Sequence, residues 1–400
     1  MKLPDAPWRR RGGMRRLLDA LGAPEGETRY VGGAIRDTLL ELPVSDVDLA
    51  TRLEPGEVME RLRKAHIRAV PTGLAHGTVT AVLSDGPVEV TTLRRDVATD
   101  GRRATIAYTG DWQEDAARRD FTINALSADP VSGEIFDYHG GIGDLDARTV
   151  RFIGDPLTRI AEDHLRILRF FRFHARFGAG DPDPAALDAC TVRANDLMAL
   201  SRERIADELL KLLALPDPGP TIALMVERGI LAPVLPEIGK DGVARLSELV
   251  GRETAAGEAA DPLRRLAALL PADPALAAAM AARLRLSNKA AKRLASAAGR
   301  DGEAIGDPRA LAYRIGIAEA VDRLLLAGGE GVAALRSWQK PRFPLGGGDL
   351  IAMGLPPGPV VAKTLQAIER QWMAEGFSAD EGAIRALARD HVDQALRASQ

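Results

Sequence analysis

The strongest constraint on the fold is a change in sequence pattern near residue 150. Before this position, short β-branched runs alternate with short helical stretches, and residues 78–83 and 88–93 flank an Asp-Gly turn that predicts a hairpin. From Asp155 onward the pattern is helical almost throughout, and the first of these helices is expected to extend to Gly178. We therefore predict an α+β protein in which a small mixed β-sheet unit precedes an all-helical region.

Further signals divide these two regions. The mixed unit is expected to contain a strand ending at Val31, a helix over residues 34–42 and a strand over residues 44–50. Residues 94–111 form a polar segment that contains arginine and glycine. In the helical region, a second helix is expected over residues 201–214, and the sequence PDPGP that begins at residue 216 is the clearest linker.

The composition excludes several classes of protein. A length of 400 residues allows about two to four domains, and a net charge of −3 argues against a protein that coats nucleic acid with its whole surface. No stretch approaches the roughly 18 uninterrupted apolar residues of a membrane span, so no membrane partner is expected. The single cysteine, Cys190, excludes an intrachain disulfide and a four-cysteine zinc site. The basic segment WRRRGGMRR precedes a stretch too short and polar for a signal-peptide core, which favours the cytoplasm.

The basic residues are mostly arginine. Of the 53 Lys and Arg residues, 45 are arginine, and residues 151–177 hold six arginines against three acidic residues. Arginine offers a planar fork of donors that matches phosphates and base edges, so this bias favours a site for nucleotides or nucleic acid. A biased genome composition is the alternative explanation.

Two glycines and two aspartates stand close together in the mixed unit. Gly32 and Gly33 mark a turn from a strand into a helix, where backbone N–H groups can approach an anion, and Arg36 follows one turn later. This turn matches neither the dinucleotide-binding nor the Walker glycine pattern. Asp46 and Asp48 would point to the same face of a strand, where their charges repel unless a divalent cation such as Mg²⁺ lies between them.

A phosphate-binding turn beside a metal-binding pair of carboxylates describes nucleotidyl transfer. In this reaction divalent cations activate a hydroxyl group and stabilise the pyrophosphate that leaves. Each feature also has an alternative without function. In that alternative the two glycines form a plain turn, and the two aspartates lie at a strand edge that faces solvent.

Four segments, in this order, carry a family resemblance. They are GGAIRD with the following DVD, LRRDVATDGRRATIAYTGDWQEDAARRDFTINAL (93–126), AEDHLRILRFFRF (161–173) and SRERIADELLKLL (201–213). Together they resemble the motifs of class II tRNA nucleotidyltransferases, the CCA-adding enzymes, and of the related bacterial poly(A) polymerases. The segment over residues 343–372 is also similar to the C-terminal region of this family.

The resemblance implies a domain plan and a catalytic centre. Residues 1–150 would form the nucleotidyltransferase head, 151–215 a helical neck that reads the base, and 216–400 a helical body and tail that bind tRNA. Asp46 and Asp48 would hold catalytic Mg²⁺, and Glu89 on a neighbouring strand is a guess for a third carboxylate. Among the other residues that the resemblance assigns, those that would contact or support the nucleotide's phosphates and ribose are Gly33, Arg36, Arg119, Asp120 and Asn124.

The resemblance also implies a base reader in the helical neck. Asp163 and Arg166 are three residues apart, so on one continuous helix they would lie side by side and offer an acceptor and donors to a base edge. Arg169 and Arg172 would extend this row and bind phosphate or the incoming nucleotide. The alternative is a surface ion pair worth a few tenths of a kcal/mol. Ser201 and Arg204 are expected to support helix packing.

The function implied by the resemblance is addition of CCA to the 3′ end of tRNA from CTP and ATP. Alternatives of the same fold are a poly(A) polymerase, or an enzyme that adds only CC or only A. The segment between residues 99 and 120 resembles the loop of CCA-adding enzymes, and its loss would be expected in a CC-only enzyme. A non-catalytic RNA-binding or nucleotide-sensing protein would have no use for Asp46 and Asp48. The oligomeric state is not determined by the sequence.

Overall fold

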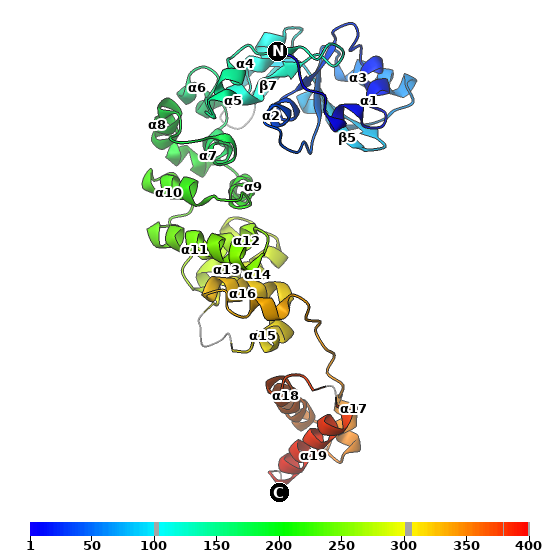
Figure 1. Ribbon diagram of the computed structural model, residues 1–400, viewed down its shortest axis with the longest axis vertical. Helices are drawn as coiled ribbons and strands as arrows, with labels where there is room; N and C mark the ends of the chain where they lie inside the picture. The colour runs from blue at the N-terminus through cyan, green and yellow to red at the C-terminus, as the bar shows by residue number, and fades with distance from the viewer. Residues whose placement is uncertain (100–103, 301–305, 379, 399–400) are drawn as a thin grey trace. The chain divides into compact units, whose positions relative to one another are not determined.

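The computed structural model describes residues 1–99, 104–300, 306–378 and 380–398 (Figure 1). The chain divides into two compact units. The first comprises Met1–Lys240 with Arg283–Arg285, and the second comprises Asp241–Ala282 with Leu286–Gln400. The predicted boundary at residue 216 therefore falls inside the first unit, and the three-domain plan stays a prediction.

A seven-stranded mixed sheet forms the head of the first unit. Its strand order is β3-β4-β5-β2-β1-β8-β9, and β2 and β5 are parallel whereas the other neighbours are antiparallel. A separate two-stranded sheet pairs β6 with β7. The strands are β1 (Thr28–Val31), β2 (Asp48–Thr51), β3 (Arg68–Gly73), β4 (Thr78–Leu83), β5 (Gly86–Thr92), β6 (Arg94–Thr99), β7 (Ala104–Tyr108), β8 (Ser127–Ala128) and β9 (Ile135–Phe136).

Helices surround this sheet and then make up the rest of the chain. In the first unit the α-helices are α1 (Met14–Ala20), α2 (Gly33–Leu39), α3 (Pro55–Lys64), α4 (Trp112–Ala117), α5 (Gly141–Asp146), α6 (Pro156–Glu162), α7 (Arg166–Phe177), α8 (Pro184–Val192), α9 (Arg202–Leu213) and α10 (Gly219–Glu227). Helix α11 (Lys240–Ala256) begins at the boundary. In the second unit they are α12 (Pro262–Leu269), α13 (Pro274–Arg283), α14 (Asn288–Ala298), α15 (Pro308–Ile315), α16 (Ile317–Ala327), α17 (Gly347–Ala352), α18 (Pro359–Ala374) and α19 (Glu381–Arg397).

A cluster of phenylalanines joins the head to the following helices. Phe121, directly after the head motif RRD, packs against Phe152 with ring centroids 4.9 Å apart and against Phe173 of α7 at 5.2 Å. Phe170, also on α7, lies 5.8 Å from Phe152. These rings are buried, and contacts of aromatic pairs contribute about 1 kcal/mol each beyond the burial of their area. The cluster therefore packs α7 against the head.

Several predicted elements are confirmed. The hairpin forms as β4 and β5, and the second helix forms as α9, whose N-cap Ser201 makes no side-chain capping bond. The strand expected over residues 44–50 is shorter at its start, because β2 begins only at Asp48. The polar segment 94–111 contains the β6–β7 pair, whose loop and neighbouring side chains lie outside the described residues.

The single helix expected from Asp155 to Gly178 is wrong. The chain forms α6 and α7, separated at Asp163, whose backbone is extended (φ −151°, ψ 105°). The Asp163 carboxylate accepts a hydrogen bond from the Leu165 N–H at 3.1 Å. This local capping interaction replaces helix continuation, which a periodicity of apolar residues does not reveal.

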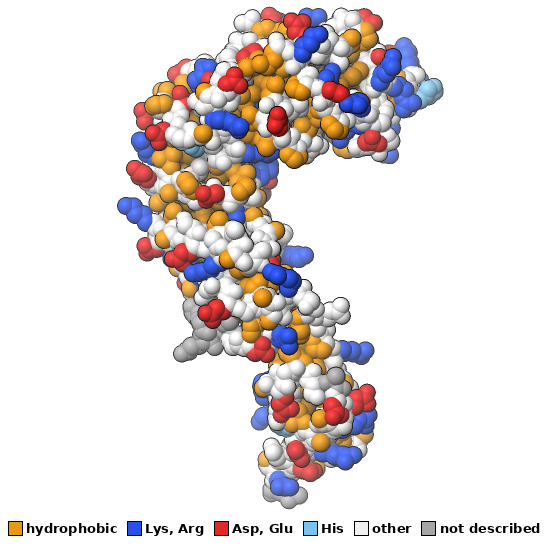
Figure 2. Space-filling view, in the orientation of Figure 1, with side chains coloured by type: hydrophobic (Ala, Val, Ile, Leu, Met, Phe, Trp, Pro, Cys, Tyr) orange, Lys and Arg blue, Asp and Glu red, His pale blue; other side chains and the backbone are white. Residues whose placement is uncertain are grey.

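Charged side chains of both signs are interspersed on the face of the first unit seen in Figure 2, in line with the small net charge. Within the described ranges, no single helix is long and apolar enough to cross a membrane, although α12 and α13, bent by 118°, meet the length and composition criteria as a pair.

Candidate active site

The glycine turn between β1 and α2 lies at one side of a cavity of about 710 Å³. Gly32 has φ +68°, a conformation that L side chains rarely adopt, and a Cβ atom there would lie 3.4 Å from Nη1 of Arg119. Gly33 follows as the first residue of α2 and also lines the cavity. Glycine at position 32 therefore permits both the turn and the close approach of Arg119.

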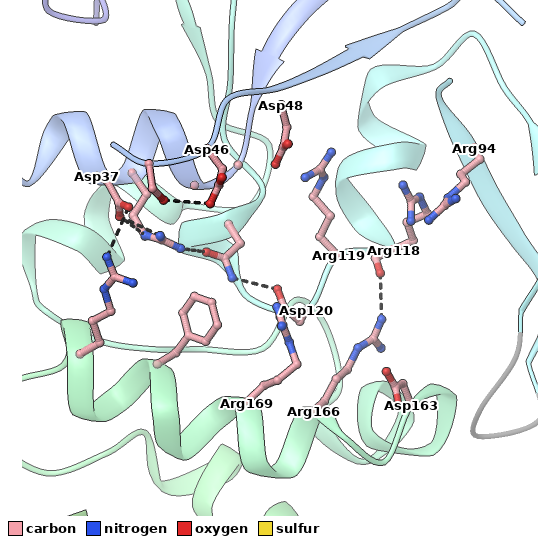
Figure 3. A pocket seen from close by; sticks show the side chains of 17 residues that line it. Asp37, Asp46, Asp48, Arg94, Arg118, Arg119, Asp120, Asp163, Arg166 and Arg169 are labelled. Atoms are coloured by element: carbon pink, nitrogen blue, oxygen red, sulfur yellow. Dashed lines mark hydrogen bonds and ion pairs between the residues drawn. The ribbon is translucent and has the colours of Figure 1, made fainter. Parts of the chain in front are cut away.

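Asp46 and Asp48 line the same cavity as this turn. Asp48 begins β2, whereas Asp46 lies in the segment before it, so the shared strand face used in the prediction does not apply. Figure 3 shows both aspartates on one side of the cavity and Asp163 with Arg166 on the other. The residues that line the cavity are Gly32, Gly33, Arg36, Asp37, Ser45, Asp46, Asp48, Arg94, Arg118, Arg119, Asp120, Asn124, Asp163, Arg166, Arg169, Phe173 and Arg176.

The electrostatic environment of Asp48 favours a cation. The pKa of Asp48 is raised to about 6, first by burial and then by the negative charges of Glu89 and Asp46, while the charge of Arg119 opposes the rise. A divalent cation beside the two carboxylates would favour their ionised forms. Glu89 is the register partner of Asp48 on β5, but it is exposed and does not line the cavity.

The donor set fits a divalent cation that would complete its ligand shell with other oxygen atoms. Asp46 and Asp48 offer carboxylate oxygens, and the Ser45 hydroxyl donates to Asp46 at 2.8 Å. No group of three or more His, Cys, Asp or Glu side chains in the described part of the chain is arranged to hold a metal. Mg²⁺ commonly takes only one or two carboxylates and completes its shell with water and substrate phosphates.

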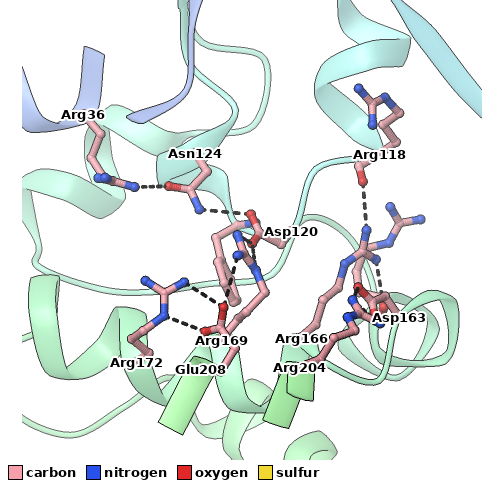
Figure 4. A network of polar contacts seen from close by, with 12 residues as sticks. Arg36, Arg118, Asp120, Asn124, Asp163, Arg166, Arg169, Arg172, Arg204 and Glu208 are labelled. Carbon is pink, nitrogen blue, oxygen red and sulfur yellow. Dashed lines mark hydrogen bonds and ion pairs between the residues drawn. The ribbon is translucent and has the colours of Figure 1, made fainter. Parts of the chain in front are cut away.

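A series of connected polar contacts joins residues that line the cavity (Figure 4). Arg36 donates to the Asn124 side-chain oxygen and to Asp37, and Asn124 in turn donates to Asp120 at 3.0 Å. Arg169 donates to the other Asp120 oxygen, with Nε at 2.8 Å. These contacts connect the glycine-turn helix α2 with α7, so Asp120 and Asn124 act as supports for two cationic side chains.

Ion pairs and hydrogen bonds keep Asp120 and Arg169 in their charged forms. Burial alone would raise the pKa of Asp120, but the charge of Arg169 and hydrogen bonds from Asn124, Arg169 and the Phe121 N–H together lower it. Conversely, burial would lower the pKa of Arg169, and Asp120 with Glu208 raises it. Asp120 therefore stays a carboxylate, which leaves it an acceptor for both neighbours.

The predicted position of Asp163 and Arg166 side by side on one helical face is wrong, whereas their predicted role in reading the base stays a prediction. Because the helix breaks at Asp163, the two residues do not lie three apart on one helical face. The carboxylate of Asp163 is instead held by Arg204 of α9, whose Nη2 donates to its two oxygens at 3.1 and 2.8 Å. Arg204, expected to serve only packing, thus orients Asp163 at the cavity wall.

Arg166 is oriented by acceptors of its own. It pairs with Glu162 and donates to the backbone carbonyl oxygens of Arg159 at 2.8 Å and of Arg118 at 3.0 Å. Asp163 and Arg166 nevertheless both line the cavity (Figure 3), and Figure 4 shows Arg204 beside Asp163 and Arg118 beside Arg166. Each is fixed separately, which holds an acceptor and a set of donors in place without mutual neutralisation.

The structure does not place Arg172 in the predicted row of nucleotide-binding arginines. Arg172 does not line the cavity, and its guanidinium contacts Glu208 of α9, with Nε 2.6 Å from Oε2. Glu208 is only 3 % exposed and also lies 3.8 Å from Arg169. The expected row of arginines is therefore divided: Arg166 and Arg169 line the cavity, and Arg172 connects α7 to α9.

Glu208→Gln is expected to lower the free energy of unfolding by about 2 kcal/mol, because it removes the buried charge that compensates Arg172 and Arg169. Urea unfolding measures this change. The matched control is Asp207→Asn on the same helix, whose ion pair with Lys211 is exposed and is expected to contribute below about 0.5 kcal/mol. Equal changes in the free energy of unfolding for the two substitutions would show that the buried charge of Glu208 does not stabilise the fold more than an exposed ion pair does.

Sequence reasoning missed several residues of the site. Arg94, Arg118 and Arg176 line the cavity. Arg176 lies 3.6 Å from Asp37, and Arg118 pairs with Asp115 at 2.8 Å. The doubled arginine of RRD was a signal for Arg118, whereas the contribution of Arg94 depends on the β6–β7 pair, which was not predicted.

The glycine turn, the two aspartates and the arginine-lined cavity, set in a head with a mixed sheet, define a nucleotidyltransferase. Residues 28–151 match the family described as Poly A polymerase head domain, and residues 181–241 match the probable RNA- and SrmB-binding site of polymerase A. CCA tRNA nucleotidyltransferase 1, mitochondrial, of Mus musculus is 34% identical over 393 residues, which cover 93% of this chain and 88% of the relative. The chain therefore belongs to the CCA tRNA nucleotidyltransferase family.

Solved structures of this family share the fold. The Bacillus stearothermophilus CCA-adding enzyme in complex with CTP has a TM-score of 0.71 at 25% identity and covers 96% of this chain and 98% of its own. The Thermotoga maritima CCA-adding enzyme complexed with tRNA has a TM-score of 0.66 at 21% identity, with coverages of 96% and 94%. The predicted α+β fold with a mixed-sheet head and helical remainder is confirmed.

Proposed function

We propose that this chain adds CCA to the 3′ end of tRNA, using CTP and ATP as substrates and releasing pyrophosphate. The observation that carries the proposal is that Asp46 and Asp48 line one cavity with Gly33, Arg119 and Arg166. The structures named above hold CTP in one case and tRNA in the other, which supports these two kinds of partner. The cytoplasm remains the proposed compartment, while the mouse relative is named as mitochondrial.

The residues of the cavity have separate roles in this proposal. Asp46 and Asp48 would hold Mg²⁺, which when bound lowers the pKa of the attacking hydroxyl and neutralises charge on the leaving pyrophosphate. Gly33 and Arg36 lie at the glycine turn and Arg119 lies beside it, so they would bind the triphosphate. Arg169, paired with Asp120, would add positive charge on the opposite wall.

Base selection is assigned to Asp163 and Arg166. Their orienting partners, Arg204 for the former and Glu162 with two carbonyl oxygens for the latter, hold the polar groups before the base arrives. A base with the wrong donors would leave buried polar groups unpaired, at a cost of about 1–3 kcal/mol for each. This arrangement supports acceptance of C and A without a nucleic-acid template.

A direct assay tests the proposal. Purified protein is incubated with Mg²⁺, tRNA that ends before the CCA, and each labelled NTP alone or CTP with ATP, and the products are resolved on a gel. We expect two C additions from CTP and one A addition that depends on the earlier C additions. A long ladder of added adenosines would favour a poly(A) polymerase, an activity that the description of the matched head family includes. Products that contain only added C or only added A would favour a CC-only or an A-only enzyme.

A further inference from the structure

An arginine-lined hollow lies near the N-terminus of the first unit, outside the active-site cavity. It has a volume of about 840 Å³, and its lining comprises Arg9, Arg10, Arg11, Gly12, Gly13, Arg15, Arg16 and Asp19. The segment consists of the 3-10 helix Pro7–Arg10, a glycine turn and α1, which Figure 1 labels in the first unit. None of these residues lines the cavity that contains Asp46 and Asp48.

The apolar residues of this segment fix its backbone to the head. Trp8 is buried, packs edge-on against Tyr30 at 4.8 Å and donates to the Thr38 hydroxyl at 2.9 Å. Met14 and Leu17 are fully buried. The Gly12 N–H donates to Asp85 at 2.6 Å, and Gly13 has φ +82°, which turns the chain between the two helices. Arg15 and Arg16 are therefore exposed side chains on a backbone segment that is fixed to the head, whereas Arg9 also donates to backbone carbonyl oxygens of Leu3, Pro4 and Pro130.

The arginines of this hollow are poorly compensated. Arg15 and Arg16 are exposed and have no side-chain partner among the described residues. Arg11 donates one Nη to the Asp85 carbonyl oxygen at 3.3 Å, while its other Nη has no partner in the described structure. Arg10 pairs with Asp5, but both side chains are well exposed, so the pair contributes little.

The extent of the basic surface favours a polyanion over a single small anion. A second hollow of about 570 Å³ shares Arg9, Arg10, Arg15 and Asp19 with the first. Guanidinium groups bind phosphate through two parallel hydrogen bonds, and a row of them follows successive phosphates. The whole chain has a net charge of −3, so the positive charge of these arginines is a local concentration and not a property of the whole surface. The first hollow is lined by no aromatic ring on which a base could stack.

We propose that this hollow binds the phosphate backbone of the tRNA substrate, at a surface separate from the site of nucleotide addition. The inference rests on the proposed function for the identity of the RNA. Binding here would be electrostatic and independent of sequence, so it would add affinity and positioning without base selection.

The test compares tRNA binding of the full chain and of Arg15→Gln/Arg16→Gln over a range of salt concentrations, measured by fluorescence anisotropy. The matched control is Arg68→Gln/Arg148→Gln, which removes two exposed arginines of the same unit whose side chains lack partners in the described structure. We expect the first variant to bind several-fold more weakly. The dependence of log K on log salt should become shallower, with the magnitude of its slope reduced by about 1 to 2, since each phosphate contact contributes about 0.9 to that magnitude. Arg15→Lys/Arg16→Lys should retain the slope because it retains the charge.

Equal affinities and slopes for the two glutamine variants would overturn the inference. It would also be overturned if tRNA binding were unchanged while binding to phosphatidylglycerol vesicles were lost, because the surface would then recognise a membrane. Failure of the proposed function looks different: the unaltered chain would add no nucleotide in the gel assay, whatever the salt dependence of tRNA binding.

Discussion

Asp46→Ala is expected to reduce nucleotide addition by at least about a hundredfold, the effect of removing one electrostatic stabiliser from an active site. The remaining carboxylate, Asp48, cannot by itself compensate a divalent cation beside the triphosphate. Because Asp46 lies outside the arginine-lined hollow that we propose for the tRNA backbone, tRNA binding should be almost unchanged. Single-turnover addition of labelled CTP to tRNA ending before the CCA measures the first effect, and a binding titration measures the second.

The matched control for this prediction is Asp146→Ala. Asp146 is an exposed residue of α5 in the same head and does not line the cavity. It should add nucleotides at the rate of the unaltered chain. If Asp46→Ala retained that rate as well, the assignment of the two aspartates to Mg²⁺ would be wrong, and with it the reaction that we propose for the cavity.

Arg166→Ala is expected to reduce the preference for CTP and ATP over GTP and UTP by about tenfold, which corresponds to about 1.4 kcal/mol and lies within the cost of one unpaired buried group. The physical reason is that Glu162 and two carbonyl oxygens hold the Arg166 guanidinium at the cavity wall. Without it, the donors that distinguish one base edge from another are lost. Rates of incorporation for each of the four NTPs measure this ratio.

The comparison for this prediction is Arg176→Ala. Arg176 also lines the cavity, but it lies near Asp37 on the side of the glycine turn. Its loss should weaken binding of all four NTPs to a similar extent, because it would contact phosphate. An unchanged base preference in Arg166→Ala would remove the idea that protein side chains select the base.

The sequence was sufficient for the division into a mixed-sheet region and a helical region, and for the residue types that line the candidate site. The β-branched runs and the turn residues between them specified the β4–β5 hairpin, because alternation and turn chemistry are local properties. Through the family resemblance, the ordered motifs assign Gly33, Asp46, Asp48 and Arg119 to one reaction. The structure brings these four residues to one cavity.

Long-range ion pairs could not be predicted in this way. The partner of Asp163 is Arg204, 41 residues later, and the partner of Arg172 is Glu208, 36 residues later. A helical repeat relates residues three or four apart only while the helix continues, and the break at Asp163 ended that relation. Which of several arginines reached which carboxylate depended on how α7 and α9 pack.

By itself, the sequence determined the class of fold, the glycine turn and the identity of the acidic and basic groups, since these follow from local backbone preference and side-chain chemistry. Only the tertiary structure decided how those groups pair. Phe121 packs against Phe173, which places α7 against the head. Because burial of an unpaired charge is costly, each charged side chain then pairs with an oppositely charged group that it can reach. The pairs that result keep Arg166 and Asp163 at the cavity wall and take Arg172 away from it.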